Sequence, residues 1–383
     1  MKSKNLVDSH PYLNFAVNLG HASFTAFLNL GEAKSKIEHI SNAPILPEVR
    51  EEMHKLYLAK GIHATTAIEG NTLTEDQVRQ IIEKEFKAPP SIAYQKQEIN
   101  NVADACNEIA GKDWEALITE EELRNYNSTV LSNLSMEKYV VPGEYRTYTV
   151  TAGKYRAPHA QEVPRLMRGF IEWLNNFDLN AIGEEKKLHL AILKAIYAHL
   201  FFVWIHPFGD GNGRVARLIE LRVLLGSGVP TPVAHLLSNH YNKTRDMYYR
   251  KLGDAQQNSW NFVEYALQGL IDGLAEQIGK IQQQQKIVLW GHLVRVLITG
   301  DSPVASRRRT LARELAMRNS PVRKAHIPLM SIDLAGKYAG KTLKTVDRDV
   351  KELLELELVK QTAGHIEANW DQVLSLLPSK LLT

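Results

Sequence analysis

One short run of the sequence combines residue types that suit chemistry on a phosphate chain. Residues 206–217 read HPFGDGNGRVAR and join two apolar stretches. Gly211 and Gly213 permit backbone conformations in which successive N–H groups point at a single anion. Arg214 and Arg217 are three residues apart, so they would share one face of a helix starting here, and guanidinium groups bind phosphate oxygens through paired hydrogen bonds. The run therefore predicts an anion site at a helix N-terminus.

Two other side chains of this run extend the prediction from binding to reaction. His206 is the usual proton acceptor near neutral pH, and Asp210 is a hard oxygen ligand of the kind that Mg²⁺ takes together with phosphate oxygens. The sequence therefore predicts a site for a nucleotide polyphosphate, a metal ion and a general base. A purely structural interpretation, in which Asp210 and Asn212 cap the next helix, gives the histidine and the arginines no purpose. Calcium-loop, P-loop and dinucleotide-binding motifs fail on spacing.

The same run matches, at every defined position, the Fic family pattern His-x-Phe-x-Asp/Glu-Gly-Asn-Gly-Arg-x-x-Arg. The chain resembles a Fic-domain protein adenylyltransferase over about residues 44–280. The resemblance implies transfer of AMP from ATP to a Ser, Thr or Tyr hydroxyl of a target protein, with release of pyrophosphate. It makes His206 the general base, Phe208 the anchor of the loop, and Asp210 the holder of Mg²⁺. It assigns ATP binding to Asp210, Gly211, Asn212, Gly213, Arg214 and Arg217.

A second stretch, Thr65-Thr66-Ala67-Ile68-Glu69-Gly70-Asn71, fits the inhibitory pattern Ser/Thr-x-x-x-Glu-Gly/Asn of the same family. The resemblance implies an inhibitory helix at about residues 60–70 whose Glu69 carboxylate pairs with Arg217. That arginine would otherwise receive the γ-phosphate, so ATP would bind without its α-phosphorus in line for attack. Glu69 could also position a water for the reverse reaction, removal of AMP. The structural alternative is that Gly70 only caps a helix.

A hairpin is predicted upstream of the main run. Residues 146–150 are rich in β-branched and aromatic side chains, and a turn signal follows at Ala152-Gly153. The stretch resembles the flap of the Fic family, whose edge pairs with the target segment by strand addition. The resemblance places four flap residues next to the nucleotide, which are Val150, Thr151, Ala152 and Gly153. An ordinary surface hairpin is the alternative.

Three more positions resemble the adenosine side of the family's site. Tyr248 and Tyr249 correspond to a tyrosine pair, and Gln256 follows seven residues later, where some relatives carry Asn. Gln256 departs from the Asn of those relatives. The alternative is that the two tyrosines belong to the core.

Apolar residues recur with helical spacing through most of the chain. The stretches are 49–68, 77–85, 94–109, 163–177, 187–203, 214–225, 246–252 and 260–284. The expected fold class is therefore all-α with one small β-hairpin. The resemblances imply that this body is a helical Fic fold and that a C-terminal winged helix-turn-helix domain follows it. The expected domains are a helical arm over 1–43, the Fic domain over 44–290 and the winged-helix-like domain over 295–383.

Composition excludes several classes of protein. A chain of 383 residues with 44% hydrophobic and 23% charged residues is not globally disordered, and a formal net charge of +3 is too small for a nucleic-acid coat. The single cysteine, Cys106, excludes a disulfide framework and a Cys-rich zinc site. Residues 1–14 lack a signal-peptide apolar stretch, and 188–208 reads as a buried core helix because it contains three His and one Lys. We expect a soluble, cytoplasmic protein without membrane contact.

Residues 320–370 show a helix, turn, helix and hairpin pattern that resembles a winged helix. Basic side chains would lie on or near its second helix, namely Lys341, Lys344, Arg348 and Lys351. Acidic residues interrupt that face, namely Asp347, Asp349 and Glu352. The alternative function is therefore a DNA-binding transcriptional regulator that uses the Fic core as a nucleotide sensor. Self-modification and a homodimer are left open, and the glycine at 211 disfavours the phosphate-transferring relatives.

Overall fold

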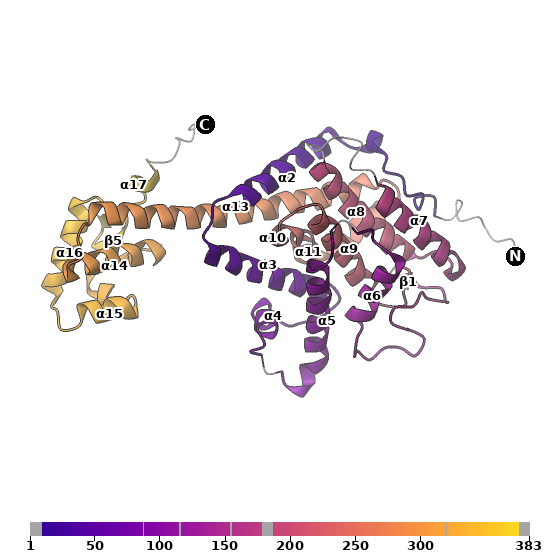
Figure 1. Cartoon of the computed structure of the whole chain (residues 1–383), viewed down its shortest axis with the longest axis horizontal. Coiled ribbons are helices and arrows are strands. Elements are labelled where there is room, and N and C mark those ends of the chain that lie inside the picture. The colour runs from indigo at the N-terminus through magenta and orange to yellow at the C-terminus, as the bar shows by residue number, and fades with distance from the viewer. Residues whose placement is uncertain are drawn as a thin grey trace. The chain divides into compact units, whose positions relative to one another are not determined.

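The computed structural model describes residues 10–86, 88–114, 116–153, 155–177, 187–318 and 320–374. The chain divides into two compact units, Met1–Ile278 and Gly279–Thr383. The first unit is a helical body with one two-stranded sheet, which confirms the predicted all-α class (Figure 1). Its elements are η1 (Leu19–His21), α2 (Phe24–Asn42), α3 (Pro47–Ile68), α4 (Glu75–Ile82), η2 (Pro90–Ile92), α5 (Ala93–Ala110), α6 (Glu120–Val130), β1 (Thr151–Ala152), β2 (Tyr155–Arg156), η3 (Ala160–Glu162), α7 (Val163–Asn176), α8 (Lys187–Ile205), α9 (Asn212–Gly226), α10 (Thr231–Ala234), α11 (Leu236–Lys243), α12 (Arg245–Asp254) and the start of α13 (Trp260–Leu297).

The centre of this unit is the pair of helices α8 and α9. Among the described residues, α8 is the one helix long and apolar enough to cross a membrane, but 72% of its most apolar window is buried inside the protein. It is thus a core helix, as its His and Lys content predicted. Phe201, Phe202 and Trp204 of α8 are all buried. The two helices hold the 206–211 loop between them at a fixed place.

Helix α3 starts and stops for local reasons. Pro47 occupies its first turn, where a missing N–H costs nothing. Gly70 follows the helix with φ +106°, and the N–H of Asn71 returns to the carbonyl of Thr66, which closes the C-terminal turn. Gly61 lets α3 approach closely, because a Cβ there would lie 2.2 Å from His235 Nδ1. The C-terminal end of α3 therefore has a defined position, and Glu69 sits on it.

The hairpin lies a few residues later than the sequence predicted. Its strands pair antiparallel, with Thr151 opposite Arg156, whereas residues 146–150 form no strand. The reason is Arg146, whose side chain turns inward and donates to the carbonyl oxygen of Tyr148, two residues on. That contact curls the segment that was expected to be extended. We call residues 145–158 the flap.

The second unit contains the end of α13, then α14 (Pro303–Arg318), β3 (Val322–Arg323), η6 (Lys324–Leu329), α15 (Ile332–Tyr338), α16 (Leu343–Glu355), β4 (Val359–Thr362), β5 (His365–Ala368) and α17 (Asp371–Leu374). The three strands form an antiparallel sheet in the order β3-β5-β4. Leu311, Val350 and Ile366 are fully buried in its core. The order of helices and hairpin is the expected one, and the winged-helix assignment stays a prediction.

Candidate active site

The loop between α8 and α9 is closed by its own asparagine. Asn212 Oδ1 accepts from the N–H of Phe208 at 2.9 Å, and Asn212 Nδ2 donates to the Phe208 carbonyl at 2.9 Å. Phe208 is fully buried and anchors the loop in the core. Gly211 has φ +79° directly before α9, a conformation that favours glycine. The loop thus brings the ends of α8 and α9 together and leaves the first N–H groups of α9 for a ligand.

The predicted contact between Glu69 and Arg217 is present. Arg217 Nη2 donates to Glu69 Oε1 at 2.5 Å and to the Thr65 carbonyl at 3.0 Å. Its Nε donates to Thr65 Oγ1 at 2.5 Å. Burial opposes ionisation of Glu69, but attraction to Arg217 and the hydrogen bond from it prevail, so the pKa of the Glu69 carboxyl lies below its ordinary value. An ionised carboxylate therefore faces the arginine.

The Glu69 carboxylate also lies over the start of α9. A Cβ added to Gly213 would come within 2.5 Å of Glu69 Oε1 and 3.2 Å of Arg217 Nη1. An acidic group at a helix N-terminus is stabilised by the helix dipole and the free N–H groups. Glu69 is thus an internal anion at the place where the sequence predicts phosphates.

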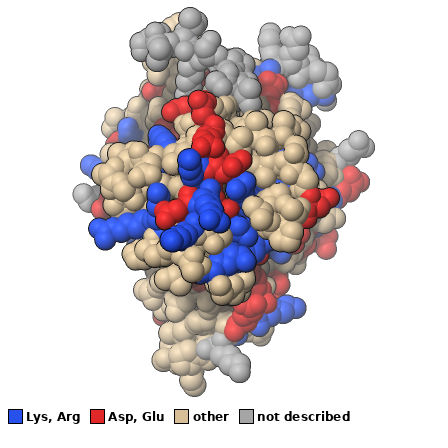
Figure 2. Space-filling model, turned by 90° about the vertical axis from the view of Figure 1, so that its left-hand side faces the viewer, with Lys and Arg blue, Asp and Glu red and all other residues tan. Residues whose placement is uncertain are grey.

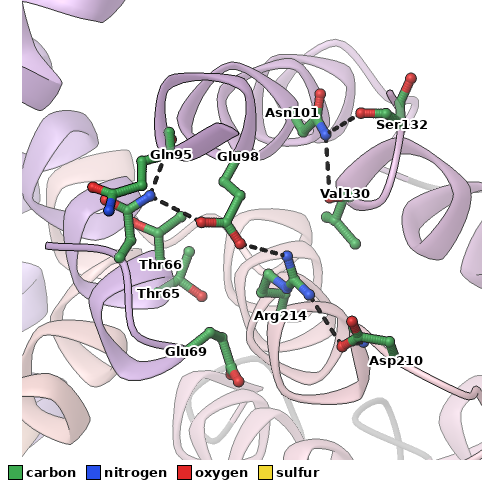
Figure 3. Close-up of polar contacts among 12 residues, drawn as sticks. Thr65, Thr66, Glu69, Gln95, Glu98, Asn101, Val130, Ser132, Asp210 and Arg214 are labelled. Carbon is green, nitrogen blue, oxygen red and sulfur yellow. Dashed lines mark hydrogen bonds and ion pairs between the residues drawn. The ribbon is translucent and has the colours of Figure 1, made fainter. Parts of the chain in front are cut away.

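The second arginine is held by two other carboxylates (Figure 3). Arg214 Nη1 donates to Glu98 Oε1 of α5 at 3.2 Å, and Arg214 Nη2 to Asp210 Oδ1 at 3.2 Å. The other oxygen of Glu98 accepts from Asn71 Nδ2 at 3.0 Å. Burial raises the pKa of the Glu98 carboxyl, against the pull of Arg214 and Asn71. The chain Asn71–Glu98–Arg214 therefore links the segment after α3 to the helix α9.

Both guanidinium groups retain binding capacity. Arg217 Nη1 and Arg214 Nε are buried and have no hydrogen-bond partner among the described residues. A buried donor without an acceptor costs about 1–3 kcal/mol. Two such donors beside a helix N-terminus fit an anionic ligand that approaches α9.

His206 is neutral at physiological pH. Burial lowers the pKa of its imidazole to about 4, and the nearby Arg146 adds to this, although Val203, Glu69 and Asp210 oppose it. Its Nδ1 lies 3.3 Å from the Val203 carbonyl, a contact that favours a proton on Nδ1 and an unprotonated Nε2. An imidazole in this form accepts a proton, as a general base must.

Asp210 fits the expected role as a magnesium ligand. Its side chain is 48% exposed, and its contacts with Arg214 and the Gly211 N–H both use Oδ1. Within the described ranges no group of three or more His, Cys, Asp or Glu side chains could hold a metal. The donor set present, one carboxylate beside an anion site, suits an ion that takes its other ligands from phosphate and water.

The remaining predicted residues lie at different depths. Thr151, Ala152 and Gly153 of the flap are exposed, and Val150 is half-buried. Tyr248 is buried and its hydroxyl lies 2.9 Å from His199 Nε2 in the core.

Tyr249, in contrast, is 48% exposed, so it alone of the tyrosine pair offers a ring to a ligand at the surface. Gln256 lines a cavity of about 400 Å³ together with Thr149 and Tyr155 of the flap.

Sequence reasoning assigned no role to several residues that the structure places at the site. Thr65 belongs to the quoted inhibitory pattern, and its hydroxyl could have been matched to an arginine. Glu98 gives no local signal, because it is 116 residues from Arg214 in sequence. Asn127 holds the loop by donating to the Asp210 carbonyl at 2.8 Å, across 83 residues of sequence.

Comparison with known proteins matches part of the chain to a protein family. Residues 117–224 match the Fic/DOC family. A protein adenylyltransferase fic-1 of Caenorhabditis briggsae is 26% identical over 265 residues, which cover 68% of this chain and 48% of the relative. A protein adenylyltransferase Fic of Drosophila persimilis is 31% identical over 170 residues, 44% of this chain and 32% of the relative. The chain thus spans about half the length, or less, of these relatives.

Solved structures share the fold. A Fic family protein from Desulfovibrio desulfuricans G20 has a TM-score of 0.55 at 21% identity and covers 92% of this chain and 97% of its own. Fic-1 (residues 134–508) from C. elegans has a TM-score of 0.55 at 25% identity and covers 67% of this chain and 73% of its own. The run at 206–217 lies inside the matched family segment. The chain therefore carries a domain of the Fic/DOC family.

Proposed function

We propose that the chain is a protein adenylyltransferase, which transfers AMP from ATP to a Ser, Thr or Tyr hydroxyl of a target protein. One observation carries the proposal: a neutral His206 stands beside the N-terminus of α9, where Arg214 and Arg217 keep unpartnered buried donors. The names of the relatives support the same activity.

The geometry suggests how the chain's residues act. The phosphates of ATP lie across the start of α9, where its N–H groups, Arg214 and Arg217 neutralise their charge. Nε2 of His206 takes the proton of the target hydroxyl as its oxygen attacks the α-phosphorus. The bond from that phosphorus to the bridging oxygen breaks, and pyrophosphate leaves. Magnesium, held by Asp210, would neutralise charge on the leaving group.

We further propose that the observed state is self-restrained. Glu69 occupies both Arg217 and the space over Gly213. Phosphates that bind with full use of α9 must displace it. The same carboxylate could position a water for removal of AMP from a modified target. Modification of the chain itself, a homodimer and a cytoplasmic location remain predictions from the sequence.

The test is intact-mass spectrometry after incubation with Mg-ATP, comparing the wild-type chain with Glu69→Gly and with Glu69→Gly/His206→Ala. We expect the Glu69→Gly chain to gain one or more adenylyl groups and release pyrophosphate, and the double variant to gain none. A Glu69→Gly chain with bound ATP but no more adenylyl transfer than wild type would remove the restraint hypothesis. Transfer that persists without His206 would reject the assignment of the base.

A second candidate, DNA binding by α16, is favoured by one observation. Asp349, which interrupts the basic face in sequence, is buried and accepts from Arg307 and Arg308 at 2.6 and 3.0 Å, so it presents no negative charge on that face. The outer face of α16 and the turn before it keep exposed basic side chains, which are Lys341, Lys344, Arg348 and Lys351. Figure 2 shows Lys and Arg gathered on one face of the molecule with Asp and Glu between them.

Retention of labelled duplex DNA across a range of salt concentrations tests this candidate. Specific binding should exceed binding to scrambled sequence by orders of magnitude and fall steeply with salt. Equal, weak retention of both would leave α16 as a surface for protein contacts.

A further inference from the structure

The flap supplies the partners that the end of α8 lacks. The last four carbonyl oxygens of a helix accept no hydrogen bond from the helix itself. In α8 the carbonyl of Trp204 accepts from the Tyr155 hydroxyl of β2. The carbonyl of Ile205 accepts from Arg146 Nη2 at 3.4 Å, and the next carbonyl, of His206, accepts from Arg146 Nε at 2.7 Å. The C-terminal cap of the helix that carries the base is therefore made by the flap.

Arg146 joins the two structures with a single side chain. Besides the carbonyls of Ile205 and His206, its guanidinium donates to the Tyr148 carbonyl at 2.8 Å and to the Pro158 carbonyl at 2.7 Å. Its own backbone N–H donates to the Pro207 carbonyl. We call these contacts the Arg146 clamp. It fixes both ends of the flap and the backbone of the base in one frame.

The burial of the Arg146 guanidinium is unusual because its hydrogen bonds to described residues all go to backbone carbonyl oxygens. Arg146 is 4% exposed, and no carboxylate in the described part of the chain pairs with it. A buried charge without a counter-ion is costly. The negative end of the α8 dipole, carried by those last carbonyls, compensates part of this cost.

The clamp also explains the backbone of His206. This residue has φ +51°, a left-handed conformation that costs a non-glycine residue roughly 1–2 kcal/mol. Such conformations persist where the surroundings impose them. Here the surroundings are Arg146 on the carbonyl of His206 and the Phe202 carbonyl on its N–H at 2.9 Å.

We propose that Arg146 is a positioning residue for the transfer step, which fixes the distance between the base and the flap edge that presents the target hydroxyl. The proposal rests on the proposed function. The expected effect is on the rate, because a misplacement of about 1 Å between reacting groups costs about 10²-fold in rate. Binding of the ATP phosphates should survive loss of the clamp, because the N–H groups and arginines that receive them belong to α9 and not to the flap.

The test starts from the full-length Glu69→Gly chain, with Arg146→Lys, Arg146→Ala and, as a matched control, Arg165→Ala. Arg165 is an arginine of α7 with a 58% exposed side chain, outside the site. Adenylyl transfer is measured by intact mass with saturating Mg-ATP, and ATP affinity by calorimetry. We expect Arg146→Lys to lose about 10²-fold in rate with ATP affinity within about threefold of the parent. Added guanidinium at non-denaturing concentration should restore part of the lost rate to Arg146→Ala. The control Arg165→Ala should keep the rate of the Glu69→Gly chain, and guanidinium should not raise it.

Hydrogen exchange gives a readout that is independent of activity. In Arg146→Ala the amides of His206 and of Ala157, which donates to the Val150 carbonyl at 3.2 Å, should exchange faster together and recover together with guanidinium. If the Glu69→Gly chain binds ATP but transfers no AMP, the proposed function is wrong. The exchange rates of the His206 and Ala157 amides would still test the clamp in that case. The clamp proposal is overturned if Arg146→Lys transfers at the parental rate, if rate and ATP affinity fall equally, or if the two amides respond separately.

Discussion

At the scale of single residues, the site is packed so closely that a larger side chain would collide with its neighbours. Gly213 is the clearest case, because the carboxylate of Glu69 already occupies the space of a side chain there. The same contact shows that the restraint and the phosphates compete for one position. Two predictions follow from these residues, one on size and one on charge.

Gly213→Ala should weaken ATP binding at least about tenfold, because a methyl group would cover the N–H groups and the Arg217 donor that bind anions. Calorimetric titration with Mg-ATP in the Glu69→Gly background measures this. Gly31→Ala in α2 is the matched control, since nothing lies within 4 Å of its added Cβ. The control should keep its affinity and gain roughly 0.5–1 kcal/mol of stability. Equal affinity in both variants would contradict the assignment of this helix end.

The Glu69–Arg217 pair should stabilise the chain in a pH-dependent way. The pKa of Glu69 is lowered in the folded chain from an ordinary value of 4.5. Its contribution is therefore complete above about pH 4.5 and is lost as the pH falls through the folded pKa. The unfolding free energy of wild type minus that of Glu69→Gln should be largest near neutrality and shrink in acid. A difference that is constant or grows below pH 4.5 would show that the charge of Glu69 does not support the fold.

At the scale of elements, α3 is attached to α9 through two routes. One is direct, from Arg217 to Thr65 and Glu69. The other passes through Asn71, Glu98 of α5 and Arg214. The second route means that the end of α3 is held even when the first is broken.

Asn71→Ala should therefore loosen the inhibitory segment without removing its carboxylate. We expect adenylyl transfer above wild type and below Glu69→Gly, with no further gain when the two changes are combined, because both act through one segment. Intact mass after incubation with Mg-ATP measures this. Asn42→Ala, at the end of α2 where Nδ2 donates to the Glu38 carbonyl, is the matched control. Fully additive gains would mean that Asn71 acts elsewhere.

Much of the site could be predicted from sequence, and the reason is that its central parts are local. The run at 206–217 and the pattern ending at Glu69 place base, phosphate donors and restraint in short, recognisable strings. Arg146 and Glu98 were not assigned roles because their partners lie 60 and 116 residues away and are in part backbone carbonyls, which carry no sequence signal. The hairpin lies later than predicted because β-propensity gives no information on the inward turn of the Arg146 side chain, which bonds to backbone carbonyls.

At the scale of the whole molecule, each unit has its own core and its own buried ion pairs. Asp349 in the second unit accepts from Arg307, Arg308 and Tyr338. No residue of the proposed active site belongs to that unit. Damage to the second core should therefore leave nucleotide binding intact.

Asp349→Ala should destabilise the second unit by about 3–5 kcal/mol, because Arg307 then remains buried without its partner. Calorimetric unfolding should show an earlier transition for that unit, while ATP affinity in the Glu69→Gly background stays unchanged. Asp333→Ala, which removes a carboxylate 49% exposed in α15, is the control and should shift the transition little. A loss of ATP affinity on Asp349→Ala would reveal coupling between the units.

The left-handed backbone of His206 has one more consequence. Glycine adopts that conformation without penalty, so a chain with His206→Gly would lose its base and relieve a local strain in the same step. A laboratory selection for heat tolerance alone would then favour the inactive sequence, and the histidine would be retained only where catalysis is selected as well.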